Sequence, residues 1–163
     1  MKVLLAKSAG FCYGVKRAVE LAAKTGEETG GCWMLGDLIH NRFVVEDLAR
    51  RGIRKTADSA LLGPDDIVII RSHGELKSVL DALEQLGVRC VNATCPNVIR
   101  IQRLVAQAEA EGRQPVIIGE AAHPEVAGIA SWCLSPLVFD GPESVQAWLD
   151  TPESKREIPM TVV

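Results

Sequence analysis

The sequence predicts an α/β fold built on parallel β-strands. Short apolar segments rich in Val and Ile alternate with segments whose apolar residues recur every three or four positions. The first pattern is typical of buried strands in parallel sheets, and the second of amphipathic helices packed on them. Strands that alternate with helices along a chain form parallel sheets whose faces the helices cover.

The first half of the chain shows this alternation clearly. We expect strands at residues 3–6, 32–35, 67–70 and 88–91. Helical periodicity follows them, on faces that include Val15, Ala18, Val19 and Ala22, then Val44, Val45 and Leu48, then Leu76, Val79, Leu80 and Leu83. Glycines within residues 26–31 are expected to break the first of these helices. Asn41 is expected to cap the second.

The second half continues the pattern. A helical face over residues 98–108 is followed by a strand at 116–118 and a short helix from Pro124. A strand at 137–139 and a helix over 145–149 come next. The final run, residues 158–163, is strand-like, and one more β–α step would be needed to bury it. We therefore expect the chain to be part of a longer protein.

Composition and charge exclude several classes of partner. The chain has 163 residues, of which 47% are hydrophobic and 24% charged, as in ordinary globular proteins. The net charge of −3 and the pI near 5.6 argue against nucleic acid or an anionic membrane. No apolar run approaches the roughly 18 residues of a membrane span. Lys7 also ends the first apolar run before a signal-peptide core could form, so we expect a cytoplasmic protein.

Cys95 stands where a predicted strand passes into a predicted helix, in the segment Asn92-Ala93-Thr94-Cys95-Pro96. The free N–H groups and the dipole of a helix N-terminus favour a thiolate. Pro96 supports this placement because proline is tolerated at the first helical position. The pattern therefore predicts a presented thiol rather than a core residue. Thr94 could bind substrate or only form the turn.

The three histidines all lie in loops after predicted strands: His40, His73 and His123. Ligands of parallel sheets bind at the carboxyl ends of the strands. A single histidine is more often structural, but three in equivalent positions favour a common site that holds phosphate or a metal. Glu125 follows His123 in the first turn of a helix, where it could complement the helix dipole or act as a general acid.

The other cysteines divide into two groups. Cys12 lies between two glycines that let the backbone approach a bulky ligand, so it is a second candidate for a functional thiol. Cys32 and Cys90 fall inside predicted strands, and Cys133 lies in a weakly patterned stretch. We interpret these three as packed core residues, because free cysteine is among the most buried residue types. Disulfides are not expected without a secretion signal.

Five motifs then occur in a fixed order: Gly10-Phe11-Cys12-Tyr13-Gly14-Val15, Ile39-His40-Asn41, Ser72-His73-Gly74, Ala93-Thr94-Cys95-Pro96 and His123-Pro124-Glu125-Val126. Together they resemble the N-terminal half of the 4-hydroxy-3-methylbut-2-enyl diphosphate reductases, which complete the methylerythritol phosphate route to isoprenoids. The similarity extends from the first residue to the last. Each motif alone is weak, but their shared order makes coincidence implausible.

The resemblance implies three small α/β domains around a central [4Fe-4S] iron–sulfur cluster. It implies that Cys12 and Cys95 are two metal ligands, that His40, His73 and His123 hold the diphosphate, and that Glu125 relays a proton to the leaving hydroxyl. Electrons would arrive singly from a donor such as ferredoxin or flavodoxin, giving isopentenyl and dimethylallyl diphosphate. Residues 1–13 would belong to an incomplete third domain, 14–95 to the first domain and 96–163 to the second.

The family's third cluster cysteine and its later Ser, Thr and Asn substrate contacts match nothing in these 163 residues. We therefore expect the chain alone to be inactive. Three alternatives stay open. Cys12, Cys95 and histidines could make a zinc site. The chain could bind a diphosphate without metal or turnover. Finally, Cys95 could be the nucleophile of a thiol enzyme.

Overall fold

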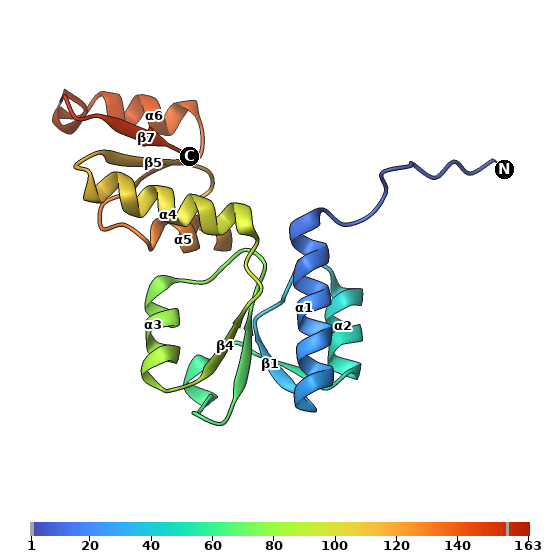
Figure 1. Ribbon diagram of the computed structural model, residues 1–163. Helices are drawn as coiled ribbons and strands as arrows, with labels where there is room; N and C mark the ends of the chain where they lie inside the picture. Colours follow the sequence, from blue (N-terminus) through green and yellow to red (C-terminus); the bar gives the residue numbers. More distant parts are fainter. Residues whose placement is uncertain (1, 156) are drawn as a thin grey trace.

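Two parallel β-sheets form the framework of the computed structural model, which describes residues 2–155 and 157–163 (Figure 1). The first sheet has the order β2-β1-β3-β4 and the second the order β6-β5-β7. The strands are β1 (Cys32–Leu35), β2 (Ile53–Thr56), β3 (Ile67–Ile70), β4 (Arg89–Asn92), β5 (Gln114–Ile118), β6 (Leu137–Phe139) and β7 (Met160–Val162). All pairings among these strands are parallel, so the predicted α/β class is confirmed.

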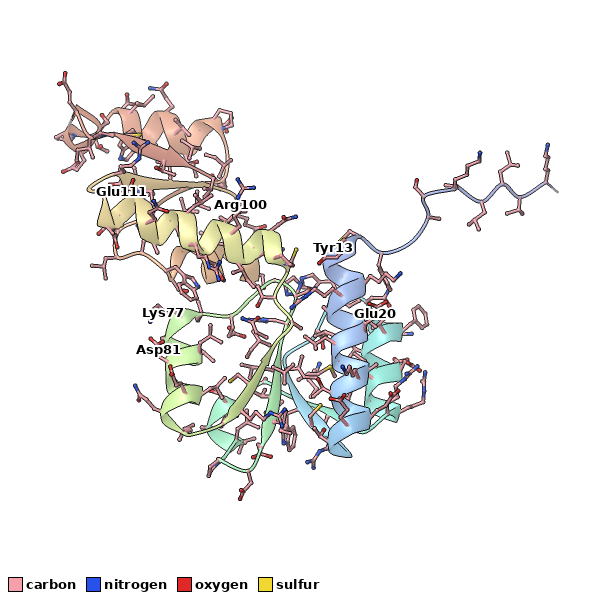
Figure 2. The ribbon with its side chains drawn as sticks, viewed as in Figure 1. Tyr13, Glu20, Lys77, Asp81, Arg100 and Glu111 are labelled. Atoms are coloured by element: carbon pink, nitrogen blue, oxygen red, sulfur yellow. The ribbon has the colours of Figure 1, made fainter. Side chains whose placement is uncertain are left out.

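Helices cover the sheets. The α-helices are α1 (Tyr13–Thr29), α2 (Arg42–Arg50), α3 (Lys77–Gln85), α4 (Pro96–Ala110), α5 (Pro124–Ala130) and α6 (Pro142–Leu149), and the short 3₁₀ helices are η1 (Ser59–Leu61) and η2 (Pro152–Lys155). Helices α1 and α2 lie on one face of the first sheet and α3 lies on the other (Figure 1). Charged pairs such as Lys77–Asp81 occupy the outer helix surfaces (Figure 2). None of the helices in the described part is long and apolar enough to cross a membrane.

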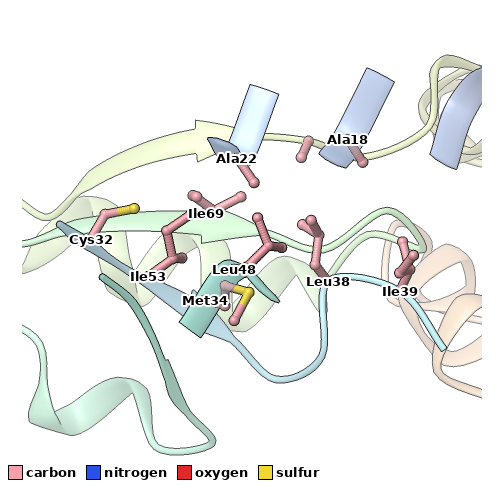
Figure 3. Packing of buried hydrophobic residues seen from close by; sticks show 10 residues of the cluster. Ala18, Ala22, Cys32, Met34, Leu38, Ile39, Leu48, Ile53 and Ile69 are labelled. Carbon is pink, nitrogen blue, oxygen red and sulfur yellow. The ribbon is translucent and has the colours of Figure 1, made fainter. Parts of the chain in front are cut away.

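The first sheet is buried on both faces, which explains its continuous apolar strands. On one face, Ala18 and Ala22 of α1 pack over Met34 and Ile69 (Figure 3). All four are at most 1% exposed. On the other face, Leu83 of α3 joins a separate apolar cluster with strand residues of β1 and β3. Residues next to each other in a strand therefore pack into different apolar clusters, one on each face of the sheet.

The expected N-terminal strand at residues 3–6 is wrong. Residues 2–12 form no strand, and the side chains of Val3, Leu4 and Leu5 are 77–86% exposed. A strand is stable only where a neighbour pairs with its backbone N–H and C=O groups. Among the described residues no strand lies beside this segment, which extends away from the sheets (Figure 1).

The expected helix break within residues 26–31 is confirmed, because α1 ends at Thr29 with the left-handed Gly30 as its C-cap, although the helix continues through Gly26. A Cβ atom at Gly26 would lie 2.8 Å from Cγ1 of Ile53. Glycine at this position therefore allows α1 to pack closely on β2. Its role is close approach rather than helix termination.

Two further differences concern edge strands. Strand β2 was not expected, because Arg54 and Lys55 at its centre are exposed and only its end residues are buried. Cys90 was expected in the core but is exposed. It lies on β4, the edge strand of the sheet, where the side chains are less covered than in β1 and β3. Cys32 is buried as expected, and Cys133 is partly buried within the cluster of the second sheet.

Candidate functional site

The predicted histidines meet at the carboxyl ends of strands from both sheets. His40 follows β1 and His73 follows β3, and these neighbouring strands send their chains to opposite faces of the sheet, into α2 and α3. Such a point in a parallel sheet is a crevice that suits ligands. The rings of His40 and His73 have centroids 4.2 Å apart. His123, which follows β5 in the second sheet, places its ring 6.2 Å from that of His40.

A cavity of about 510 Å³ lies beside this histidine cluster. Of the residues predicted to be functional, five line it: Cys12, His40, His73, Cys95 and Glu125. His123 does not line the cavity but lies next to it through its contact with His40. Side chains separated by more than 110 positions in the sequence are thus brought together around one cavity.

Four helix N-termini surround the same cavity. The N-cap residues are Cys12 for α1, Asn41 for α2, Cys95 for α4 and His123 for α5. Three of these line the cavity, and at the fourth helix Glu125 in the first turn does so. Helix N-termini present free N–H groups and a partial positive charge. The cavity is therefore suited to anions and to thiolates.

The two thiols belong to helix ends that lie in direct contact. A Cβ atom at Gly14, in the first turn of α1, would lie 2.5 Å from the sulfur of Cys95. Arg17 of α1 donates a hydrogen bond to the carbonyl of Thr94 at 3.2 Å, next to Cys95. Neither Cys12 nor Cys95 uses its side chain to cap its helix. Both sulfurs are therefore free for other partners.

The ring of His73 favours the neutral form, which donates one hydrogen bond. Burial lowers the pKa of His73 to about 4, helped by the nearby charges of His40, Arg71 and His123. Its buried Nδ1 has no hydrogen-bond partner among the described residues. Nδ1 of His123 accepts the N–H of Glu125 at 3.2 Å, which leaves Nε2 as the nitrogen that carries the N–H of that ring. His73 can donate to a ligand without carrying charge.

Sequence reasoning missed several cavity residues. Ser72 and Asn97 line the cavity, and Asn41 does so besides capping α2, where its Oδ1 accepts the N–H of Val44 at 3.3 Å. These three residues follow strands or begin helices, and that position in the sequence could have identified them as cavity residues. Thr94 is 2% exposed and does not line the cavity. Its hydroxyl donates to the carbonyl of Arg71 at 3.4 Å, as in a residue that forms the turn.

The described residues do not form a metal site by themselves. In residues 2–155 and 157–163, no group of three or more His, Cys, Asp or Glu side chains is arranged to hold a metal ion. The cavity is lined by two thiols, those of Cys12 and Cys95.

Comparison with known proteins identifies the family. The model of the family described as "LytB protein" matches residues 3–161. The chain belongs to the LytB protein family. This confirms the resemblance predicted from the ordered motifs.

Two similar curated relatives of this LytB chain carry the same enzyme name. It is 42% identical over 137 residues to the 4-hydroxy-3-methylbut-2-enyl diphosphate reductase of Caldanaerobacter subterraneus subsp. tengcongensis, covering 82% of this chain and 48% of the relative. Identity to the enzyme of the same name from Clostridium perfringens is 46% over 134 residues, covering 80% and 48%. The chain thus spans about half the length of the curated relatives it matches.

Solved structures agree with the LytB assignment. A structure of (E)-4-hydroxy-3-methyl-but-2-enyl diphosphate reductase is similar with a TM-score of 0.79 and 35% identity, over 91% of this chain and 54% of that one. The reductase from Plasmodium falciparum has a TM-score of 0.83 over 96% of this chain and 48% of that one. Its identity is 21%, so this second likeness shows the fold alone.

Proposed function

We propose that this chain is part of a 4-hydroxy-3-methylbut-2-enyl diphosphate reductase and supplies the diphosphate-binding side of its active site. The observation that carries this proposal is the meeting of three histidines, two thiols and a glutamate around one cavity. The reaction replaces the substrate hydroxyl by hydrogen, consumes two electrons and two protons, and releases water. Its products would be isopentenyl and dimethylallyl diphosphate.

The diphosphate would be held by imidazole and backbone N–H donors. His40, His73 and His123 would donate N–H groups to phosphate oxygens, since imidazole keeps at least one N–H in either protonation state. The N-termini of α2 and α5 add backbone N–H groups and dipoles of the correct sign. This combination compensates a dianion without a lysine or arginine, neither of which lines the cavity in the described part of the chain.

Cys12 and Cys95 would hold an iron–sulfur cluster. The donor set fits in kind, because thiolates are the usual cluster ligands and both sulfurs lie at helix N-termini that favour the thiolate. Gly14 leaves the Cys95 sulfur the room it needs. When bound, such a cluster passes electrons singly and offers Lewis-acid iron to a hydroxyl oxygen. Two thiolates are an incomplete set, so further ligands would come from outside this pair.

Glu125 would transfer the proton that the leaving hydroxyl needs. Its carboxyl group lines the cavity from the first turn of α5, and its own N–H orients the ring of His123. A carboxylic acid in this place can give the proton with which the substrate hydroxyl leaves as water. The same side chain could then accept the next proton from solvent.

The remaining features of the proposal follow from the family. Ferredoxin or flavodoxin would donate the electrons, in the cytoplasm. Residues 14–95 and 96–163 would form separate α/β domains, with residues 1–13 belonging to a third. Because the relatives are about twice as long, we expect the 163 residues alone to bind diphosphate without turnover.

An anaerobic preparation tests the proposal. We expect a brown protein with iron and inorganic sulfide, which Cys12→Ala or Cys95→Ala weakens and Cys90→Ser, at an exposed cysteine outside the cavity, does not. Zinc without sulfide would contradict the cluster and support the zinc alternative. Titration with the hydroxymethylbutenyl diphosphate should show binding that His73→Asn weakens. Diphosphate binding by a protein that takes up neither iron nor sulfide under these conditions would instead favour a non-redox binding domain.

A further inference from the structure

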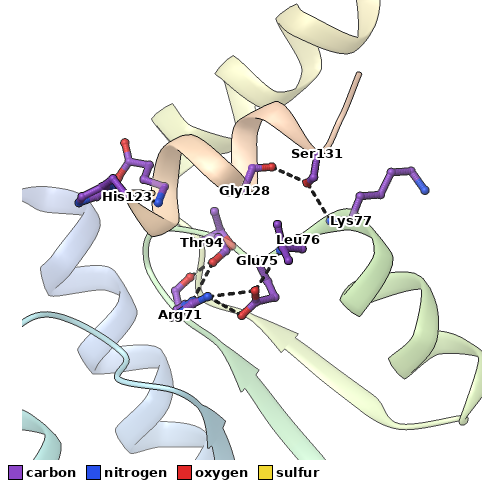
Figure 4. A network of polar contacts seen from close by, with 10 residues as sticks. Arg71, Glu75, Leu76, Lys77, Thr94, His123, Gly128 and Ser131 are labelled. Atoms are coloured by element: carbon purple, nitrogen blue, oxygen red, sulfur yellow. Dashed lines mark hydrogen bonds and ion pairs between the residues drawn. The ribbon is translucent and has the colours of Figure 1, made fainter. Parts of the chain in front are cut away.

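A polar network outside the cavity joins the two sheet units (Figure 4). The N–H of Lys77, the first residue of α3, donates to the hydroxyl oxygen of Ser131 at 2.9 Å. Ser131 donates in turn to the carbonyl of Gly128 at 2.7 Å. The N-cap of α3 is Leu76, whose side chain cannot accept a hydrogen bond. Ser131, the C-cap of α5, therefore caps a helix that belongs to the other sheet.

The loop that carries His73 takes part in the same network. The carboxylate of Glu75 is 7% exposed and pairs with Arg71 at 2.9 Å. It also accepts the N–H of Leu76 at 3.0 Å, while Arg71 donates to the carbonyl of Gly74 at 3.1 Å. These bonds close the loop on both sides of His73. They fix the backbone that presents this ring to the cavity.

Helix α5 lies directly on this loop. A Cβ atom at Gly128 would lie 3.6 Å from the carbonyl oxygen of Glu75, which is ordinary contact distance. Glu75 and Ser131 thus act at adjoining points of one contact between α5 and the start of α3. Neither residue lines the cavity.

The geometry of α5 makes this contact important for the site. The helix has seven residues, with His123 as its N-cap and Ser131 as its C-cap. At about 1.5 Å rise per residue, the two caps are separated by roughly 12 Å along a rigid rod. A tilt at the Ser131 end therefore displaces His123 and Glu125 at the cavity end.

We propose that Ser131 and Glu75 are positioning residues of the diphosphate site, which hold α5 on the start of α3 so that His123 and Glu125 face His40 and His73. The diphosphate part of this inference rests on the proposed function. The contact between the helices does not, and it can be tested in the absence of ligand.

The test compares Ser131→Ala with a closely matched control. Ser144→Ala removes a hydroxyl that also donates to a glycine carbonyl three residues earlier, Gly141 at 2.8 Å, but it lies on α6 away from the contact. Amide hydrogen exchange of residues 120–131 should become about fivefold faster in Ser131→Ala, the effect of losing one hydrogen bond. It should stay unchanged in Ser144→Ala. Ser131→Thr, which keeps the hydroxyl, should restore the slower exchange.

Calorimetric titration with inorganic diphosphate tests the consequence for the site. Ser131→Ala should bind about fivefold more weakly, with Ser131→Thr restoring affinity and Ser144→Ala unchanged even where its melting temperature falls. Glu75→Gln gives a second, independent variant, and it too should weaken binding. Equal exchange and equal affinity in wild type, Ser131→Ala and Glu75→Gln would overturn the inference. A wild type that does not bind diphosphate would overturn the proposed function, while exchange still decides whether the contact positions α5.

Discussion

Replacing Gly14 by alanine should separate the two helix ends that carry the thiols. A methyl group at this position would lie 2.5 Å from the sulfur of Cys95 and 3.1 Å from its Cβ. Carbon and sulfur in contact are normally separated by more than the roughly 3.5 Å that suits two carbon atoms, so the overlap is about 1 Å. Either the Cys95 side chain rotates away or α1 shifts.

Two opposing effects determine how much Gly14→Ala changes the free energy of unfolding. Inserting a methyl group into a packed site costs about 1–3 kcal/mol. Alanine in a helix gains up to about 1 kcal/mol over glycine. Position 14 lies in the first turn of α1, where this gain is smaller than in the helix interior. We therefore expect Gly14→Ala to lower the free energy of unfolding by about 1–2 kcal/mol.

A double-mutant cycle with Cys95→Ala isolates the contact. The assay is urea unfolding of the reduced, metal-free chain. With alanine at position 95 the sulfur is gone, and the contacts that remain are with Cβ at 3.1 Å and Cα at 3.8 Å. Gly14→Ala should then cost less than about 0.5 kcal/mol, which gives a coupling of about 1 kcal/mol. Thermal unfolding should show a fall of about 2–4 °C for each kcal/mol lost.

The double-mutant cycle can refute the close approach of Gly14 to the sulfur of Cys95. If Gly14→Ala destabilises the chain equally with Cys95 and with Ala at position 95, the sulfur is not what glycine makes room for. If it stabilises the chain in both backgrounds, helix propensity dominates and α1 does not approach Cys95 as closely as the structure has it. Either result would remove the argument that the two thiols are held together by close packing.

Three further predictions concern stability. Because the pKa of His73 is lowered from 6.5 to about 4, the unfolded ring binds a proton between these pH values and the folded ring does not. The free energy of unfolding at pH 6.5 and above should therefore fall by up to about 3 kcal/mol on acidification to pH 4. Urea unfolding across this range should show the decrease, and His73→Asn should make it smaller. Glu75→Ala should cost about 2–3 kcal/mol by leaving Arg71 partly buried without its partner, and a second replacement of Arg71 by methionine should recover much of this loss in the same assay. Asn41→Ala should cost about 1 kcal/mol through the lost cap of α2, measured as a lower thermal midpoint, while Asn41→Asp should stay close to wild type.

The central strands of the first sheet could be predicted closely from the sequence. The expected bounds of β1 and β3 agree with the structure, as do those of the edge strand β6. Burial on both sides selects Val, Ile and Leu at successive positions, which leaves a clear local signal. Strand β2 lacks that signal, because Arg54 and Lys55 at its centre face solvent on an edge strand. For residues 3–6, local apolar character was present, but a strand also needs a neighbour, and sequence composition does not show one.

The location of the site was predictable, whereas its geometry was not. Loops after parallel strands share one edge of a sheet, so His40, His73 and Cys95 could be assigned to a common region from their positions alone. The 4.2 Å approach of His40 and His73 depends on β1 and β3 being neighbours. Strand order is a property of the assembled sheet. Capping of α3 by Ser131 is likewise invisible in the sequence, because 54 residues separate the two partners.

The residues around the cavity would have two different roles, which follow from the parts of the substrate that change during the proposed reaction. Substrate and products share the same diphosphate group, so contacts from His40, His73 and His123 would be equally strong before and after the chemical step. Such uniform binding increases affinity for the substrate without accelerating its conversion. Cys12, Cys95 and Glu125 also line the cavity, and in the proposed reaction they would face the part of the substrate where a bond breaks and a proton moves. Histidine N–H groups and helix N-termini would be sufficient to bind the diphosphate, a group that must also leave with the product.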